Sequence, residues 1–343
     1  MPVFPFRTRR HARWMPLAFL VVAIATVSLY ASTQSAKLRL VSTAWTPFTN
    51  DAGQPRFALD LVETAFTRIG VAASTTIVQP AQFTTMLLSG PYEGSGAAWR
   101  DAERERALVY SRPYLENRLI LVGRRGTSVT ATKLPELKGK RIAIVEGYAY
   151  GDDFEKSGPT FVRSHSEEDS LKMLLDGRVD YTLMDDLVVM FIVTNYPDEA
   201  RSKLQLGSTP LVTRPLYLAV RRTLPDAESI VSRFNEQLRN MIIDRTYHQL
   251  LHVEWISADV DGDGKPENVP QSDQAGTTAP RRVYELFSGE RALGKPSSES
   301  QRYYIGGYFY NSWSDVPDSY KVSVAGRKDP KASTASVFTF TWK

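Results

Sequence analysis

Cysteine is absent from this sequence of 343 residues. Without thiols the chain cannot form disulfides, thiolate zinc sites or iron–sulfur clusters, and it cannot carry a lipid on an N-terminal cysteine. Gly-x-Ser-x-Gly, His-Glu-x-x-His and phosphate-loop motifs are absent as well. These motifs are the usual sequence signals of serine hydrolases, zinc proteases and nucleotide-binding enzymes. The sequence therefore gives no support to those classes of enzyme.

The sequence has no net charge after residue 36. The whole chain has 42 Lys and Arg against 38 Asp and Glu, with a pI of about 9.1. Four arginines lie in residues 1–36, which contain no lysine, aspartate or glutamate, so 38 basic residues balance 38 acidic ones in residues 37–343. A nucleic-acid-binding surface normally needs an excess of Lys and Arg. We therefore expect no nucleic-acid partner.

The N-terminal segment has the layout of a secretory signal or a membrane anchor. Residues 7–13 contain the four arginines, and residues 14–31 follow as 18 positions without a charge. As a helix they would span about 27 Å, at the short end of a bilayer crossing. Ala23 and Ala25 fit the small-residue pattern of a cleavage site, so a cleaved signal peptide and a retained anchor both remain open. Either one predicts that residues 37–343 are periplasmic.

Strand-like and helix-like segments alternate along the body in two successive series. In the first, a strand over residues 38–41 is followed by apolar residues at helical spacing over 61–69. In the second, a strand over 141–145 is followed by a helix that begins at Ser166. Series of this kind fold as mostly parallel sheets covered by helices. The sequence thus predicts an α/β protein with two lobes.

Two further strands, over 118–122 and 216–220, are long enough to cross between the lobes. The end of the chain differs, because it is polar and has clustered aromatic residues, including alternating Phe338, Phe340 and Trp342 that indicate a small β-rich tail. The predicted divisions are a signal peptide or anchor (1–36), lobe 1 (37–123), lobe 2 (124–214), the return to lobe 1 with a C-terminal helix (215–257), an acidic loop (258–269), a linker (270–281) and the aromatic β tail (282–343).

Seven short pieces of the body occur in an order and at a spacing that resemble a known family. They are residues 44–48, 50–53, 57–61, 104–114, 137–140, 177–180 and Asp185. Together they resemble the family 3 extracytoplasmic solute-binding proteins, the polar amino-acid receptors of ABC importers, over about residues 38–256. The resemblance implies a type II-like periplasmic-binding-protein fold, in which two lobes joined by two crossover strands close on a ligand in the cleft.

The resemblance also implies two charged ligand-binding residues. Arg104 matches the arginine that binds the ligand carboxylate, a role that suits the planar fork of a guanidinium group. Asp185 matches the aspartate that binds the ligand ammonium group. Each has a structural alternative: Arg104 can form an ion pair with Asp101, and Asp185 can cap a helix beside Asp186.

The sequence departs from the family where hydroxyl residues usually contact the carboxylate. Ala97 and Trp99 stand at two of these positions, and Gly147 is followed by Tyr148, Ala149 and Tyr150 instead of by a nearby Thr or Ser. Aromatic surface replaces the hydroxyl groups, which favours a larger or stacking ligand such as a peptide or a cyclic amine, although core packing explains these aromatic residues equally well. The predicted ligand-binding residues are Trp45, Phe48, Trp99, Arg104, Tyr148, Tyr150 and Asp185.

A short acidic loop has the spacing of a calcium site. Asp259, Asp261, Asp263 and Glu267 stand at positions 1, 3, 5 and 9, with Gly264 at position 6. Calcium prefers oxygen ligands in such an arrangement, but a full EF-hand would have Glu at position 12, where this chain has proline. The loop predicts bound Ca²⁺, and a solvated acidic turn is the alternative.

These patterns predict a binding protein and not an enzyme. We expect a monomer that captures a small polar or aromatic, amino-acid-like solute for ABC import or sensing, with a permease or a membrane sensor as partner. One alternative is an envelope interaction or sensor protein with a degenerate cleft. A dehydratase built on the same scaffold is a less favoured alternative, because no catalytic motif supports it.

Overall fold

The computed structural model describes residues 1–3, 37–151, 153–280, 283–285 and 302–322. Residues 1–36 and 37–343 form separate units, and the second unit is described below. The apolar segment 14–31 lies outside the described residues. Within the described part of the chain, no helix combines the length and the apolar character that a membrane crossing needs.

A nine-stranded sheet runs through the body in the order β2-β1-β3-β9-β5-β8-β6-β7, with β4 paired to β9. β1 pairs in parallel with β2 and β3, and β6 pairs in parallel with β7 and β8. The strands are β1 (Leu38–Thr43), β2 (Ala73–Val78), β3 (Gly94–Ala98), β4 (Leu108–Tyr110), β5 (Leu115–Arg124), β6 (Arg141–Val145), β7 (Thr160–Ser164), β8 (Tyr181–Asp185) and β9 (Leu204–Arg221).

The strands β5 and β9 connect two lobes. They pair antiparallel with each other, while β9 also pairs with β3 and β4 at its end and β5 also pairs with β8. Lobe 1 contains β1–β4, and lobe 2 contains β6–β8. The prediction of an α/β fold with two crossover strands is confirmed. The crossovers are longer than the sequence indicated, because polar residues of β5 and β9 also pair.

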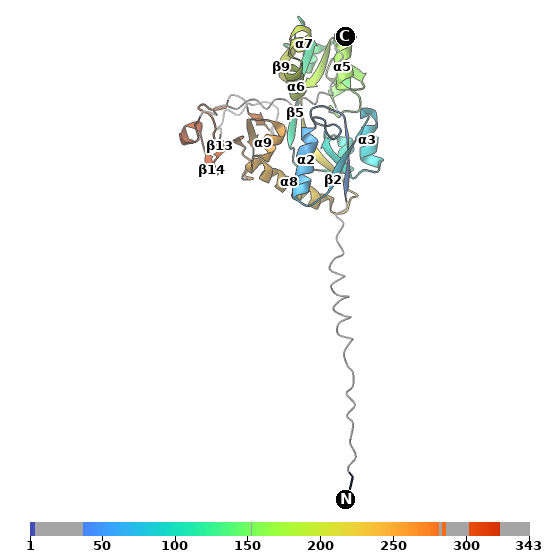
Figure 1. Ribbon diagram of the computed structural model, residues 1–343. Helices are drawn as coiled ribbons and strands as arrows, with labels where there is room; N and C mark the ends of the chain where they lie inside the picture. Colours follow the sequence, from blue (N-terminus) through green and yellow to red (C-terminus); the bar gives the residue numbers. More distant parts are fainter. Residues whose placement is uncertain (4–36, 152, 281–282, 286–301, 323–343) are drawn as a thin grey trace. The chain divides into compact units, whose positions relative to one another are not determined.

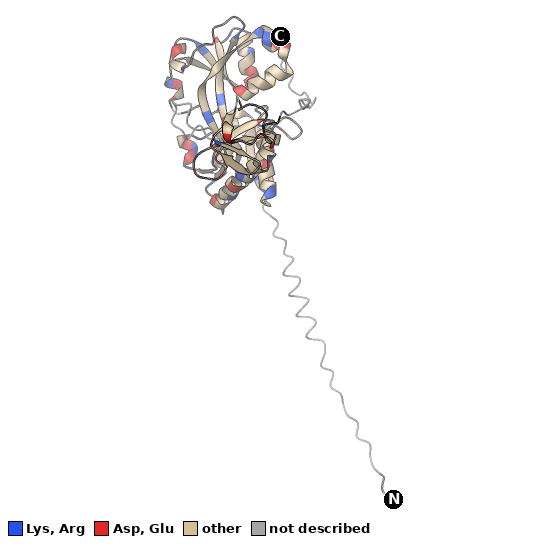
Figure 2. Ribbon diagram, turned by 90° about the vertical axis from the view of Figure 1, so that its left-hand side faces the viewer, with Lys and Arg blue, Asp and Glu red and all other residues tan. Residues whose placement is uncertain are grey.

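Helices cover the sheet in both lobes (Figure 1). In lobe 1, α2 buries Ala58, Leu61, Val62, Ala65 and Phe66 on one face, which is the 3.6-residue spacing seen in the sequence. The lobe 1 helices are α2 (Phe57–Arg68), α3 (Pro80–Ser89), α4 (Ala102–Glu105), α8 (Ala227–Ile243) and α9 (Thr246–Leu251); those of lobe 2 are α5 (Glu167–Leu175), α6 (Asp186–Asn195) and α7 (Pro197–Lys203). Basic and acidic positions are interspersed over both lobes (Figure 2).

A second, five-stranded sheet follows α9 in the order β12-β10-β11-β13-β14. It begins at residue 255, so it includes segments that the sequence suggested were a loop and a linker. Trp313, in a short 3₁₀ helix (Trp313–Asp315), packs at ring distances of 5.3 Å from Tyr303 and 6.1 Å from Trp255. Phe338, Phe340 and Trp342 lie outside the described residues. The strands are β10 (Trp255–Ala258), β11 (Glu267–Pro270), β12 (Tyr284–Glu285), β13 (Arg302–Ile305) and β14 (Tyr308–Tyr310).

The small sheet contacts a crossover strand through Tyr284 of β12. Its hydroxyl donates to the carbonyl of Glu116 (2.7 Å) and accepts from the amide of the same residue (3.2 Å). The guanidinium of Arg118 lies over the Tyr284 ring, 5.1 Å from its centroid. The C-terminal sheet is therefore fixed to β5, the strand that connects the lobes.

Candidate functional site

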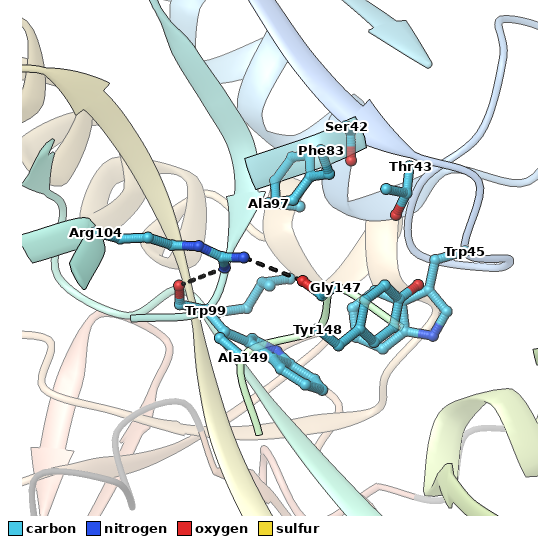
Figure 3. Close-up of a pocket in the computed structure, with 11 residues that line it drawn as sticks. Ser42, Thr43, Trp45, Phe83, Ala97, Trp99, Arg104, Gly147, Tyr148 and Ala149 are labelled. Atoms are coloured by element: carbon cyan, nitrogen blue, oxygen red, sulfur yellow. Dashed lines mark hydrogen bonds between the residues drawn. The ribbon is translucent and has the colours of Figure 1, made fainter. Parts of the chain in front are cut away.

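A narrow cavity lies where the loop after β6 meets lobe 1 (Figure 3). Its volume is about 30 Å³, which leaves room for only one or two water molecules. Both lobes contribute to its wall, as a closed interlobe cleft requires. The residues that line it are Ser42, Thr43, Trp45, Phe83, Ala97, Trp99, Arg104, Gly147, Tyr148, Ala149 and Leu216.

Gly147 allows the two lobes to approach closely at this point. It has a positive φ of 79°, and a Cβ atom there would lie 2.6 Å from the carbonyl oxygen of Pro80 at the start of α3. A side chain at position 147 would therefore collide with the backbone of lobe 1. Gly147, after which the sequence departs from the family pattern, is thus a point of contact between the lobes.

Aromatic side chains from both lobes fill the cleft. The Trp45 ring lies 5.6 Å from both Trp99 and Tyr148, and the Trp99 ring lies 5.5 Å from both Tyr148 and Tyr150. These contacts are edge-on or tilted, which is the favourable geometry for aromatic pairs. Phe48 is fully buried behind Trp45, with ring centroids 4.4 Å apart. The structure brings all five predicted aromatic residues into one cluster, in which they pack on one another.

Arg104 is held by α4 at the wall of the cavity and is only 3% exposed. Asp101 accepts from its backbone amide (2.8 Å) and pairs with its Nε (3.3 Å). Nη2 donates to the Thr84 hydroxyl (2.7 Å) and to the Gly147 carbonyl (3.2 Å), and Nη1 donates to the Trp99 carbonyl (3.3 Å). The ion pair that the sequence offered as an alternative is present. Arg104 also joins lobe 1 to lobe 2 directly.

Asp185 is fully buried at the end of β8 and caps α6. Its Oδ1 accepts from the amide of Leu187 (2.8 Å), and its Oδ2 accepts from the side chain of Asn117 (3.1 Å) and the amide of Arg118 (3.0 Å). Burial raises the pKa of Asp185 to about 7, against these hydrogen bonds. The structural alternative is again present, and Asp185 does not line the cavity.

A chain of hydrogen bonds nevertheless connects Asp185 to the aromatic cluster. Trp99 Nε1 donates to Asn117 Oδ1 (2.7 Å), and Asn117 Nδ2 donates to Asp185. The sequence analysis did not identify Asn117. Its only signal is a polar residue inside an apolar crossover strand, where a buried amide needs partners on both of its ends.

Glu167 is a second buried acid beside the cluster, and the sequence analysis treated its segment only as a helix start. It is 9% exposed at the first position of α5. Burial raises the pKa of Glu167 to about 8; the charges of Glu168 and Asp185 raise it further, and the indole of Trp45 opposes the shift. Its Oε2 has no hydrogen-bond partner among the described residues. Sequence could have suggested a buried acid only by placing the helix start against the cleft.

A larger, more polar pocket adjoins Arg104, and residues of both lobes line it as well. Its volume is about 220 Å³. Asp101, Glu103 and Glu155 line it together with Arg104 and Arg163. Acidic and basic groups are thus mixed there, so the pocket presents no single charge to a ligand.

The acidic loop lies between β10 and β11. Carboxylate oxygens of Asp259, Asp261 and Glu267 lie within 4.8 Å of one another, as ligands of one ion would. Arg302 of β13 pairs with Asp263 (2.8 Å), Glu267 (3.0 Å) and Asp261 (3.4 Å). A cation from the chain itself therefore offsets part of the negative charge of the loop, and calcium binding stays a prediction of the sequence.

Comparisons with known proteins give relatives of two kinds. No protein-family model matches the sequence. The ABC transporter arginine-binding protein 1 of Escherichia coli is 28% identical over 163 residues, 45% of this chain and 61% of that protein. The virulence sensor protein BvgS of Bordetella bronchiseptica is 26% identical over 150 residues, 43% of this chain and 12% of that protein. The chain therefore spans less than two thirds of the length of either relative.

Solved structures with the same arrangement of lobes cover nearly two thirds of the chain. An ancestral arginine-binding protein bound to arginine matches with a TM-score of 0.54 at 22% identity, over 63% of this chain and 96% of that one. The predicted resemblance and its fold are confirmed, and the small C-terminal sheet is an addition to it. The chain has the two-lobe fold of the family 3 amino-acid-binding periplasmic solute-binding proteins.

Proposed function

We propose that the protein binds a small solute between its lobes and presents it to a membrane partner outside the cytoplasmic membrane. The observation that carries this proposal is the cleft, whose wall comes from both lobes while β5 and β9 connect them. In such an arrangement a ligand in the cleft favours the closed state by contacting both lobes. The N-terminal arginines and apolar segment support a periplasmic location.

The names of the relatives support binding rather than catalysis. One is an arginine-binding protein of an ABC transporter and the other is a sensor. We propose that the partner is a permease or a membrane sensor and that the protein is a monomer. Titration with the permease or sensor domain encoded next to this protein tests the partner. Analytical ultracentrifugation tests the monomeric state.

Ligand binding is tested by following closure of the cleft. Because the chain lacks cysteine, Thr67→Cys in α2 and Lys172→Cys in α5 give one exposed labelling site in each lobe. Spin labels at these sites report the interlobe distance. We expect a ligand from a panel of amino acids, amines and short peptides to narrow the distance distribution and raise the melting temperature. The proposal would be contradicted if no compound of the panel gave a heat of binding in calorimetry or changed the distance between the spin labels.

An interaction protein with a degenerate cleft is the second candidate, because the cleft is nearly full in this state. Its cavity of about 30 Å³ is too small for an amino acid, and Arg104 bonds to Gly147 across it. If this candidate is correct, the spin-label distance will be narrow without ligand and no compound will change it. Deleting residues 270–343 will then abolish partner binding, whereas a solute receptor will keep its ligand affinity.

A further inference from the structure

The usual position for a ligand carboxylate is already occupied by the protein. Arg104 directs its Nη atoms to Thr84, Gly147 and Trp99, and its Nε to Asp101. Figure 3 shows the guanidinium group between the carbonyls of Trp99 and Gly147. A carboxylate at Arg104 would have to replace these oxygens. An anionic group is therefore disfavoured there.

The opposite charge is abundant behind the aromatic cluster. Glu167 and Asp185 are both buried, and the charge of Asp185 adds to the effect of burial in raising the pKa of Glu167. Burial raises the pKa of both Tyr148 and Tyr150, and the nearby charge of Glu167 raises it further. The indole of Trp45 lies close enough to lower the pKa of Glu167. Among the described residues, Glu167 Oε2 has no donor and Trp45 Nε1 has no acceptor. A buried acid without a counter-ion is costly unless something positive joins it.

We propose that the ligand is an organic cation without a carboxylate, an amine or guanidinium compound, bound by the aromatic faces of Trp45, Trp99, Tyr148 and Tyr150 with Glu167 as its counter-ion. This inference rests on the proposed function, because it names the class of solute for the same cleft. When the lobes open, Tyr148 and Tyr150 move away from Trp45 and Trp99, and the faces of these four rings become accessible. The cation then takes the place of the aromatic contacts across the cleft.

The charge of the site then changes on binding. Aromatic faces attract a desolvated cation, and a nearby carboxylate adds a hydrogen-bonded ion pair. Burial, and then the charges of Glu168 and Asp185, raise the pKa of Glu167 to about 8, so the protonated carboxyl group is the favoured form at pH 7 in the free protein. Binding of the cation favours the ionised carboxylate, so a proton leaves Glu167 for the solvent. Trp45 Nε1 can donate to the carboxylate that results.

Matched pairs of amino acids and their decarboxylated amines test the charge of the ligand. Agmatine against arginine, cadaverine against lysine and tyramine against tyrosine differ only in the carboxylate. We expect calorimetry to give at least about tenfold tighter binding for the amine of a pair, because only the carboxylate lacks a partner. Tighter binding of the amino acid would overturn this inference and leave the proposed function intact. If neither member of any pair binds, this inference fails, and the wider panel of amino acids, amines and short peptides decides the proposed function.

A substitution of Glu167 tests its role. Glu167→Gln keeps the shape of the side chain, and we expect it to weaken amine binding by about tenfold or more. Glu168→Gln, which removes a carboxylate from the adjacent half-buried residue, is the matched control. Calorimetry in buffers of different ionisation enthalpy gives a second readout: the unsubstituted protein should release a proton on binding at pH 7, and Glu167→Gln should not. If Glu167→Gln binds the amine with the same affinity and releases the same number of protons as the unsubstituted protein, Glu167 is not the counter-ion.

Discussion

Replacing Glu167 by glutamine should remove a loss of stability that the protein suffers as the pH rises from acidic to neutral. The folded protein holds the pKa of Glu167 at about 8, against an ordinary value of 4.5, chiefly through burial. Between these two pH values the native state binds more protons than the unfolded state. The free energy of unfolding therefore falls as the pH rises through this window, by about 1.4 kcal/mol per pH unit.

The structure gives the size of the effect. At pH 7 the carboxyl group is 2.5 pH units above its ordinary pKa of 4.5, so keeping it protonated costs about 3 kcal/mol of stability. Glutamine does not titrate and lacks this cost. The constant offset of the substitution, from its unpaired amide, is the same at every pH. The difference in stability between Glu167→Gln and the parent should therefore grow by about 3 kcal/mol from pH 4.5 to pH 7.

Urea denaturation followed by tryptophan fluorescence at pH 5, 6, 7 and 8 measures this difference. Asp185 and Glu267, whose pKa values are also raised to about 7, contribute a slope of the same sign, but both proteins contain them. Glu168→Gln controls for the loss of one carboxylate. If the stability curves of Glu167→Gln and the parent run parallel over this range, Glu167 is ionised and solvated in the native state, and the reasoning is wrong.

Three further predictions concern other parts of the structure. Asp185→Ala should cost about 2–4 kcal/mol, because it removes the cap of α6 and two buried hydrogen bonds. Asp185→Asn should cost less, because its amide oxygen can still accept from Leu187; equal losses in urea denaturation would contradict this. Tyr284→Phe should cost about 1–2 kcal/mol through its two bonds to Glu116, and an unchanged midpoint would show that the C-terminal sheet does not stabilise β5. Calcium at 5 mM should raise the unfolding free energy by about 1 kcal/mol if the acidic loop has the affinity of an extracellular calcium module. Asp261→Asn should remove that gain, and a midpoint insensitive to both calcium and chelator would show that Arg302 alone neutralises the loop.

Local patterns predicted most of the fold because its core elements are amphipathic or continuously apolar. The face of α2 and the strand β6 are readable from spacing alone, since burial of one face needs only residues close in sequence. The ends of β5 and β9 were predicted less accurately. Their outer residues are polar and join the sheet only because the partner strand is present.

The candidate site was predicted as a set of residue types and only partly as a geometry. Trp45, Trp99, Tyr148 and Tyr150 do come together, as the departures from the family pattern suggested. The polar groups that these aromatic residues contact depend on long-range contacts, which the spacing of residues in the sequence does not show. Asn117 bonds to Asp185 across 68 positions of sequence, and Arg104 bonds to Gly147 across 43.

The sequence by itself determined the two-lobe α/β fold, the balanced charge of the body and the identity of its polar and aromatic positions. These follow from local spacing and composition. Only the tertiary structure decided which charges are free: it directs Arg104 to oxygens of its own chain, and it buries Glu167 where the described residues offer it no counter-ion. The physical reason is that desolvation and pairing depend on all neighbours in space, and the neighbours of both residues come from two lobes.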